Sequence, residues 1–243
     1  MTQNSPGQLP VDGRVVMISG ANRGIGLAIA RRLHADGYRL SLGARNVTAL
    51  QQAVDSFDDE RVLKCEFSAQ VPQMAQSWVE QTVNHYGRLD ALVNNAGILR
   101  LHEFEDFDES RLSEILEVNV KAPYRLTVAA LAHLRRTGSG RIINNNSRSG
   151  LMYRPGSADY NISKYANLAL THAARFEAWE DGVRSTAICP GPTATDMAGE
   201  DIHREIELTN PDSIAAVASL VLSLPNSASV PIIPICCDLE AGI

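Results

Sequence analysis

The chain has 243 residues, 44% of them hydrophobic and 21% charged, which suits a globular protein with a large core. Its net charge of −6 at pH 7 argues against a nucleic-acid partner, because such proteins need a basic face to neutralise phosphates. No apolar run approaches the roughly 18 residues of a membrane span, and the polar start of the chain lacks the features of a signal peptide. We therefore expect a cytoplasmic protein with no membrane partner.

Short apolar runs alternate with stretches of helical periodicity along the chain. Helical spacing is clear at Ile25, Ile29 and Leu33, between the first two runs. Strands that alternate with helices form right-handed βαβ units and a parallel sheet. The pattern predicts a flexible segment over residues 1–12 and one α/β domain over residues 13–243, with helices on both faces of a doubly wound sheet of about seven strands. The predicted strands cover residues 15–18, 39–42, 62–65, 89–93, 142–143, 186–189 and 232–235.

A glycine-rich loop follows the first predicted strand and opens the first predicted helix. Glycine allows a tight turn and lets backbone approach a pyrophosphate, to which a helix N-terminus presents N–H groups and partial positive charge. The spacing is G-x-x-x-G-x-G, and a glycine turn without a ligand is the alternative. The loop consists of Gly20, Ala21, Asn22, Arg23, Gly24, Ile25 and Gly26.

Tyr160 and Lys164 stand four residues apart in a predicted helix, where positions i and i+4 share a face. An ammonium beside a phenol favours the phenolate and lowers a pKa that starts near 10. Bringing that pKa to about 7 requires roughly 4 kcal/mol, so an oxidised nicotinamide would have to assist the lysine. The chain has three lysines and 19 arginines, which favours a specific role for Lys164 over an ordinary surface lysine.

Two further polar positions could complete a site around this pair. Ser147 follows the predicted strand 142–143, where its hydroxyl could hydrogen-bond a carbonyl oxygen as charge develops on it; Ser149 is the alternative. Asn119 lies inside a predicted helix over residues 112–135, although asparagine is a poor helix former. Its side chain or a freed carbonyl could hold a water there, the alternative being a tolerated polar group in the core.

Together these motifs resemble those of the short-chain dehydrogenase/reductases over residues 13–239. The family's T-G-x-x-x-G-x-G loop has Ser19 in place of Thr, and four more motifs follow in the family's order. They are N-N-A-G at Asn94, Asn95, Ala96 and Gly97, S-x-x-G at Ser147 and Gly150, Y-x-x-x-K at Tyr160 and Lys164, and P-G-x-x-x-T at Pro190, Gly191, Thr193 and Thr195. The resemblance implies a Rossmann fold, a hydride transfer between a nicotinamide cofactor and a small or mid-sized carbonyl or alcohol, and a homo-oligomer, tetramer or dimer.

The resemblance also implies a catalytic tetrad, Asn119, Ser147, Tyr160 and Lys164, and it favours Ser147 over Ser149. Tyr160 would protonate the substrate oxygen and Ser147 would orient the carbonyl. Lys164 would bond the nicotinamide ribose and lower the Tyr160 pKa, and Asn119 would hold a relay water. Cofactor contacts are further implied for the glycine loop, the N-N-A-G motif and the P-G-x-x-x-T motif, and for Glu66 with Phe67 at the adenine ring, where the family usually has Asp.

The expected cofactor is NADP(H). NAD-preferring members of this fold place an acidic residue at the end of the second strand, where it bonds the ribose 2′-hydroxyl. By the family's spacing that position is Ala44, and Arg45 follows it. Arg45 and Arg23 could both bond a 2′-phosphate, the alternative being that both are surface charges.

Other functions remain as alternatives: a non-catalytic dinucleotide-binding regulatory module on the same fold, or an epimerase or dehydratase. Arg154 or Arg100 could bind an acidic group of the substrate, the alternative being that both face solvent. The helix after Lys164 carries small and apolar residues that suit a subunit interface. The substrate pocket is expected to include Leu99, Ser149, Met152, Tyr153, Pro192 and a loop over residues 197–212.

Overall fold

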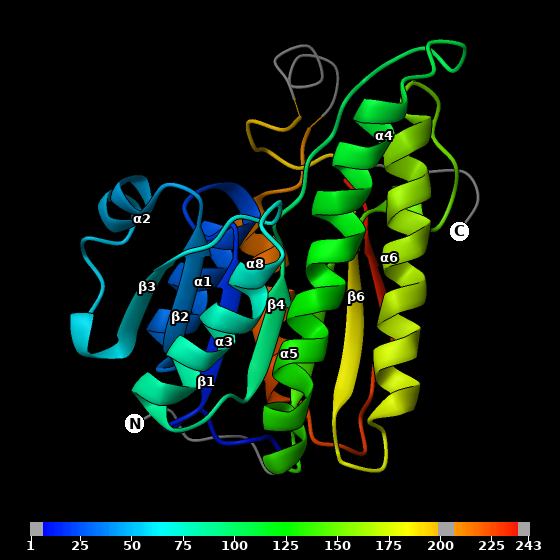
Figure 1. The fold of residues 1–243 in the computed structure, drawn as a ribbon. Coiled ribbons are helices and arrows are strands. Elements are labelled where there is room, and N and C mark those ends of the chain that lie inside the picture. Colours follow the sequence, from blue (N-terminus) through cyan, green and yellow to red (C-terminus); the bar gives the residue numbers. More distant parts are fainter. Residues whose placement is uncertain (1–6, 199–206, 238–243) are drawn as a thin grey trace.

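The computed structural model describes residues 7–198 and 207–237. Its framework is a sheet of seven strands, all parallel, in the order β3-β2-β1-β4-β5-β6-β7 (Figure 1). The strands are β1 (Val15–Ser19), β2 (Arg39–Ala44), β3 (Val62–Glu66), β4 (Ala91–Asn94), β5 (Arg141–Asn145), β6 (Arg184–Pro190) and β7 (Ile232–Ile235). The predicted doubly wound parallel sheet is confirmed, with β4 beginning two residues later than its predicted run.

Helices cover both faces of the sheet (Figure 1). On one face lie α1 (Gly24–Asp36) and α8 (Pro211–Ser223), and on the other α3 (Gln73–Tyr86), α5 (Ala122–Arg136) and α6 (Ala158–Glu177). Two shorter helices are α2 (Val47–Ala53) and α4 (Glu109–Leu116). Along β1, Val16 and Ile18 join the core under α1 and α8, whereas Val15 and Met17 join the core on the opposite face. Strand side chains alternate between faces, so a continuous apolar run marks a strand buried on both sides.

The order of the strands reverses between β1 and β4. In sheets of this kind, ligands bind in the crevice outside the carboxyl ends of the strands at that point. Ser19 ends β1, and its Oγ accepts the N–H groups of Asn95 and Ala96 at 2.9 and 3.0 Å. The sheet thus holds the glycine loop beside the N-N-A-G motif.

The predicted helix over residues 112–135 is present, but one π-helical turn interrupts its α-helical hydrogen bonds. A π-helical turn, Glu117–Lys121, separates α4 from α5. Pro123 accounts for the interruption, because proline has no N–H and its ring crowds the carbonyl four residues earlier. That carbonyl belongs to Asn119 and accepts Nδ2 of Asn167 at 3.0 Å instead.

Part of the expected flexible N-terminal segment, residues 1–6, lies outside the described residues. Closer to β1, the Leu9 N–H donates to Ser223 O at 2.8 Å and Val11 packs against the core. None of the helices within the described residues has the length and apolar character needed to span a membrane.

Candidate active site

The glycine loop is packed tightly against its neighbours. Its Gly20 N–H donates to Gly43 O in β2 at 2.8 Å, and Asn95 Nδ2 donates to Gly20 O at 3.1 Å. At Gly26, a Cβ would lie 2.2 Å from Gly20 O, so only glycine lets α1 start this close to the loop. Arg23 is the N-cap of α1, and its side chain makes no cap hydrogen bond within the described residues. The first-turn N–H groups are thus directed at the crevice, as an anion site requires.

A cavity of about 530 Å³ lies at this edge of the sheet and joins most of the predicted site residues. Those that line it are Gly20, Asn22, Arg23, Gly24, Ile25, Arg45, Phe67, Asn95, Ala96, Gly97, Ser147, Tyr160, Lys164, Pro190, Gly191, Thr193 and Thr195. Gly26, Glu66 and Asn119 do not line it: Gly26 lies beneath the loop, Glu66 is exposed, and Asn119 is buried behind the wall. Phe67 lines the cavity and Glu66 does not, because successive residues of an extended chain point to opposite sides.

Ser147, Tyr160 and Lys164 meet inside this cavity. The hydroxyls of Ser147 and Tyr160 are hydrogen-bonded to each other, and Ser147 Oγ also accepts the Ser149 N–H at 3.1 Å. Lys164 lies one turn further along α6, with its Nζ 5.4 Å from the centre of the Tyr160 ring. The same Nζ donates to Asn145 O at 3.0 Å, which fixes the ammonium at the end of β5.

Burial dominates the protonation of both groups on α6. It raises the pKa of Tyr160 to about 12, opposed by the hydrogen bond from Ser147. It lowers the pKa of Lys164 to about 8, opposed by the nearby Cys189 sulfur. Lys164 was expected to lower the Tyr160 pKa, but in the protein alone the desolvation of the phenol is the largest influence and the pKa is raised. At neutral pH the phenol therefore keeps its proton.

Replacing the buried ammonium should stabilise the fold at the expense of the site. The Lys164 pKa falls from 10.5 to about 8 on folding, which corresponds to a penalty of about 3 kcal/mol at pH 7. Subtracting about 1 kcal/mol for the lost hydrogen bond, we expect Lys164→Met to raise the unfolding free energy by about 2 kcal/mol.

The advantage of Lys164→Met should shrink as the pH rises. Between pH 8 and 10.5 the unfolded chain binds the proton that the folded chain has released, so wild-type stability increases through this window. Denaturant unfolding at pH 7 and pH 9.5 measures both effects. Lys121→Met is the control, because the Lys121 side chain is 58% exposed and its charge is not desolvated. A variant advantage that is absent, or equal at both pH values, would contradict the buried-charge account.

Asn119 clamps the wall of the cavity. Its Oδ1 accepts the Ile98 N–H and its Nδ2 donates to Ile98 O, both at 2.9 Å, while Nδ2 also reaches Ser163 Oγ at 3.0 Å. At Gly97, a Cβ would lie 3.4 Å from Asn119 Oδ1 and 3.9 Å from Lys164 Nζ. Glycine therefore keeps the space between Asn119 and Lys164 open.

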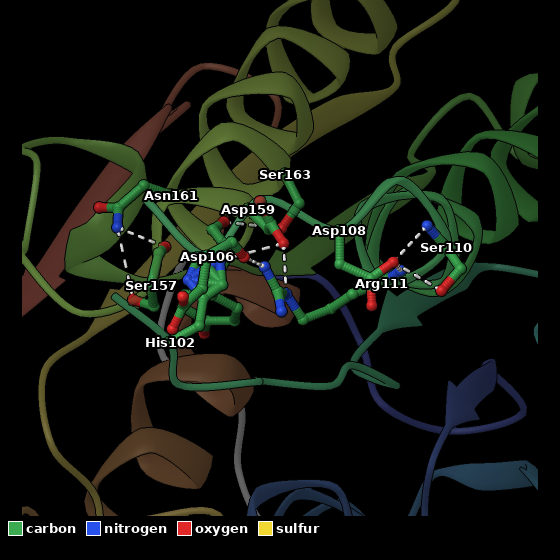
Figure 2. Close-up of polar contacts among 10 residues, drawn as sticks. His102, Asp106, Asp108, Ser110, Arg111, Ser157, Asp159, Asn161 and Ser163 are labelled. Carbon is green, nitrogen blue, oxygen red and sulfur yellow. Dashed lines mark hydrogen bonds and ion pairs between the residues drawn. The ribbon is translucent and has the colours of Figure 1, made fainter. Parts of the chain in front are cut away.

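The sequence reasoning missed a buried cluster beside Tyr160, formed by His102, Arg111 and Asp159. Arg111 Nε donates to Asp159 Oδ2 at 2.9 Å, and His102 Nε2 lies 3.1 Å from the same oxygen (Figure 2). Asp159 opens α6, Arg111 belongs to α4, and His102 lies in the segment after the N-N-A-G motif. The cluster ties the first turn of α6 to two other segments and so holds Tyr160 in place. The only sequence signal was an acid directly before Tyr160, which also suits a helix N-terminus.

The expected substrate side is partly as predicted. Leu99, Ser149 and Pro192 line the cavity, but Met152 and Tyr153 do not. The Met152 sulfur accepts Nη2 of Arg148 at 3.0 Å, and the Tyr153 side chain is exposed. Arg100 and Arg154, the two candidates for reading an acidic group, both line the cavity. Residues 199–206 of the expected substrate loop lie outside the described residues, while Met197 and Ala198 border the cavity.

The chain is similar to known proteins in sequence and in fold. Residues 14–205 match the family model described as short chain dehydrogenase. The chain is 38% identical over 229 residues to the agropine synthesis reductase of Rhizobium rhizogenes, covering 93% of this chain and 53% of that protein. It therefore spans about half the length of that relative. Among solved structures, an alcohol dehydrogenase from Thermococcus sibiricus complexed with 5-hydroxy-NADP matches with a TM-score of 0.84 and 30% identity, covering 91% of this chain and 95% of the other.

A levodione reductase matches with a TM-score of 0.87 and 25% identity, covering 93% of this chain and 97% of the other. The family model and the solved structures agree with the seven-stranded parallel sheet and its covering helices. The chain belongs to the short chain dehydrogenase family of oxidoreductases.

Proposed function

We propose that the protein is an NADPH-dependent reductase of a small or mid-sized carbonyl compound, able to run in the alcohol-oxidising direction. The observation that carries this proposal is the hydrogen-bonded pair of Ser147 and Tyr160 with Lys164 in one cavity with the glycine loop. The relative solved with 5-hydroxy-NADP supports this cofactor class, since that chain has the same fold over 91% of this one.

The residues present fit NADP(H). The glycine loop and the start of α1 would hold the pyrophosphate. Asn95, Ala96 and Gly97, which line the same cavity, would contact the cofactor beside the pyrophosphate. Lys164 Nζ, buried at the cavity, would hold the nicotinamide ribose. Thr193 and Thr195 would contact the carboxamide and pyrophosphate side. When bound, NADPH supplies the hydride; the protein supplies binding, orientation and the proton.

Tyr160 is the proposed proton donor. A pKa raised to about 12 keeps its phenol protonated at neutral pH, which is the form needed to donate to a carbonyl oxygen during reduction. Ser147, hydrogen-bonded to Tyr160, would orient that oxygen as negative charge develops. Asn119 holds the backbone beside Lys164 and would position a relay water there. The high phenol pKa therefore favours reduction over alcohol oxidation in the neutral range.

The cavity wall favours a substrate with an apolar body. Leu99, Leu101, Val118, Pro192 and Met197 are among the residues that line it. Purified protein mixed with NADPH and a panel of apolar aldehydes and ketones should consume NADPH with at least one of them. Tight NADPH binding with no turnover across a broad panel would favour the non-catalytic module instead.

We propose that the chain forms a homodimer or tetramer through α5 and α6, and that it resides in the cytoplasm. On α5 the side chains of Tyr124 and Val128 are exposed, and on α6 those of Ile162 and Phe176 are exposed, with Phe176 at 76%. The helix after Lys164 was expected to contribute Ala166, Ala169, Ala173 and Ala174 beside Leu170 and Phe176. Ala169 and Ala173 are exposed, whereas Leu170 and Ala174 face the core. The two helices lie side by side in Figure 1, so these residues offer an apolar face for a second copy.

The wild type should sediment as at least twice 26.4 kDa at micromolar concentration. Val128→Glu places a charge in the proposed interface and should weaken association at least about tenfold, since burying one apolar side chain contributes about 1.5–3 kcal/mol. Leu220→Glu, which alters an exposed apolar residue of α8 on the other face of the sheet, should leave the assembly unchanged. A monomeric wild type, or equal effects of the two variants, would refute this interface.

A further inference from the structure

Arg23 is already engaged by a carboxylate of its own chain. Its Nη1 donates to Asp196 Oδ2 at 2.7 Å, joining the glycine loop to the segment that follows β6. Both residues line the cavity. The two side chains are 66% and 74% exposed, so a ligand entering from solvent can reach the ion pair.

The segment carrying Asp196 lies directly on the glycine loop. A Cβ at Gly24 would lie 3.3 Å from Thr195 Cγ2, so the Thr195 side chain lies against Gly24, one residue away from each partner of the ion pair. The Thr195 N–H in turn donates to Thr193 O at 2.7 Å, which holds the turn together. Asp196 is therefore held within reach of Arg23 by packing and by a turn, as well as by charge.

Arg23 and Arg45 stand at one edge of the sheet. The Gly20 N–H donates to Gly43 O, and these two glycines precede Arg23 by three residues and Arg45 by two. Ala44 offers no carboxylate, and within the described residues Asp196 is the acid that pairs with Arg23. A 2′-phosphate that binds Arg23 must displace Asp196 or share the guanidinium with it.

We propose that Asp196 is a specificity-determining residue that weakens NADPH binding by competing with the 2′-phosphate for Arg23. This inference rests on the proposed function, because it assumes that NADPH is the cofactor and that Arg23 contacts its phosphate. Asp196 acts twice: it occupies the guanidinium, and its charge repels a dianionic phosphate. Cofactors without the phosphate do not need Arg23 and so escape the competition.

Asp196→Asn should tighten NADPH binding about two- to fivefold, the range set by ion pairs exposed to this degree. NADH binding should change by less than about 1.5-fold. Direct titration of protein fluorescence gives both dissociation constants without turnover. The same contrast should hold for two cofactor fragments, adenosine 2′,5′-bisphosphate and 5′-AMP. The gain should fall as salt is raised, because the screening length shortens from about 10 Å at 0.1 M to about 3 Å at 1 M ionic strength and the charges are exposed to solvent.

Asp181→Asn is the matched control. It breaks the ion pair of Asp181 with Arg135, which has an N–O distance of 2.8 Å and side chains 46% and 40% exposed. The change of net charge is the same, but the pair lies away from the cavity. It should leave both dissociation constants unchanged. In an Arg23→Gln background, Asp196→Asn should give a smaller gain, because no guanidinium remains to be released.

An Asp196→Asn variant that binds NADPH no more tightly overturns the proposal. So does an equal gain for NADPH and NADH, or an undiminished gain in the Arg23→Gln background. The proposed cofactor is tested separately, by the preference of the wild type. A wild type that prefers NADH would refute the proposed function, whereas the fragment titrations still decide whether Asp196 opposes a 2′-phosphate.

Discussion

Tyr160→Phe is expected to lower kcat for carbonyl reduction by about 10²–10⁴-fold, the usual contribution of a general acid. The substitution removes the hydroxyl that bonds Ser147 and keeps the ring over which Lys164 lies. The cavity shape and the proposed ribose contact are both retained, so the dissociation constant of NADPH should stay within about twofold. Stopped-flow or steady-state assays with NADPH, together with a binding titration, separate the two quantities.

Tyr153→Phe provides the matched control for the loss of one hydroxyl. Tyr153 is exposed and does not line the cavity, so its kcat should equal that of the wild type. Retention of more than about a tenth of wild-type kcat in Tyr160→Phe would remove Tyr160 from its proposed role. A parallel loss of NADPH affinity would point to a structural defect instead.

Arg45→Asp should erase most of the preference for NADPH. Charge-assisted hydrogen bonds contribute about 1.5–3 kcal/mol each, so two arginines can give on the order of 10²–10³-fold discrimination. The substitution removes one of these partners and places a carboxylate next to Ala44, where NAD-preferring proteins of this fold carry an acid. The ratio of kcat/KM for NADPH and NADH measures the change.

Arg31→Asp makes the same change of charge on an exposed position of α1 outside the cavity, and it controls for long-range electrostatics. Its cofactor ratio should stay within about twofold of the wild type. If Arg31→Asp and Arg45→Asp shift the ratio equally, the preference comes from the overall field and Arg45 has no specific contact.

The layers of the fold could be read from the sequence because they depend on local periodicity. Apolar runs such as residues 15–18 predicted strands buried on both faces, and β1 divides its side chains between the two cores. The glycine loop was predictable because its context, strand then helix, is local. Ser147 and Tyr160, thirteen residues apart, could be assigned to one site only through the family resemblance. The segment between them contains a short 3₁₀ turn, Arg148–Gly150, and has no simple periodicity.

What the sequence missed depends on contacts between distant segments or on one backbone detail. The Arg23–Asp196 ion pair joins residues 173 positions apart, and the His102–Arg111–Asp159 cluster joins three separate segments. The π-helical turn at Asn119 follows from Pro123, whose effect on the carbonyl four residues earlier is hidden inside a helical pattern. The expectation that Lys164 lowers the Tyr160 pKa did not account for the desolvation of the phenol, because the burial of Tyr160 is known only from the fold.

The most direct test of the central claim is kcat/KM of the wild type with NADPH and with NADH, for one carbonyl substrate from the panel. Arg23 and Arg45 line the cavity and Ala44 carries no charge, so we expect NADPH to be preferred by on the order of 10²–10³-fold, the discrimination that two charge-assisted bonds can give. Equal values for the two cofactors, or a preference for NADH, would contradict the account.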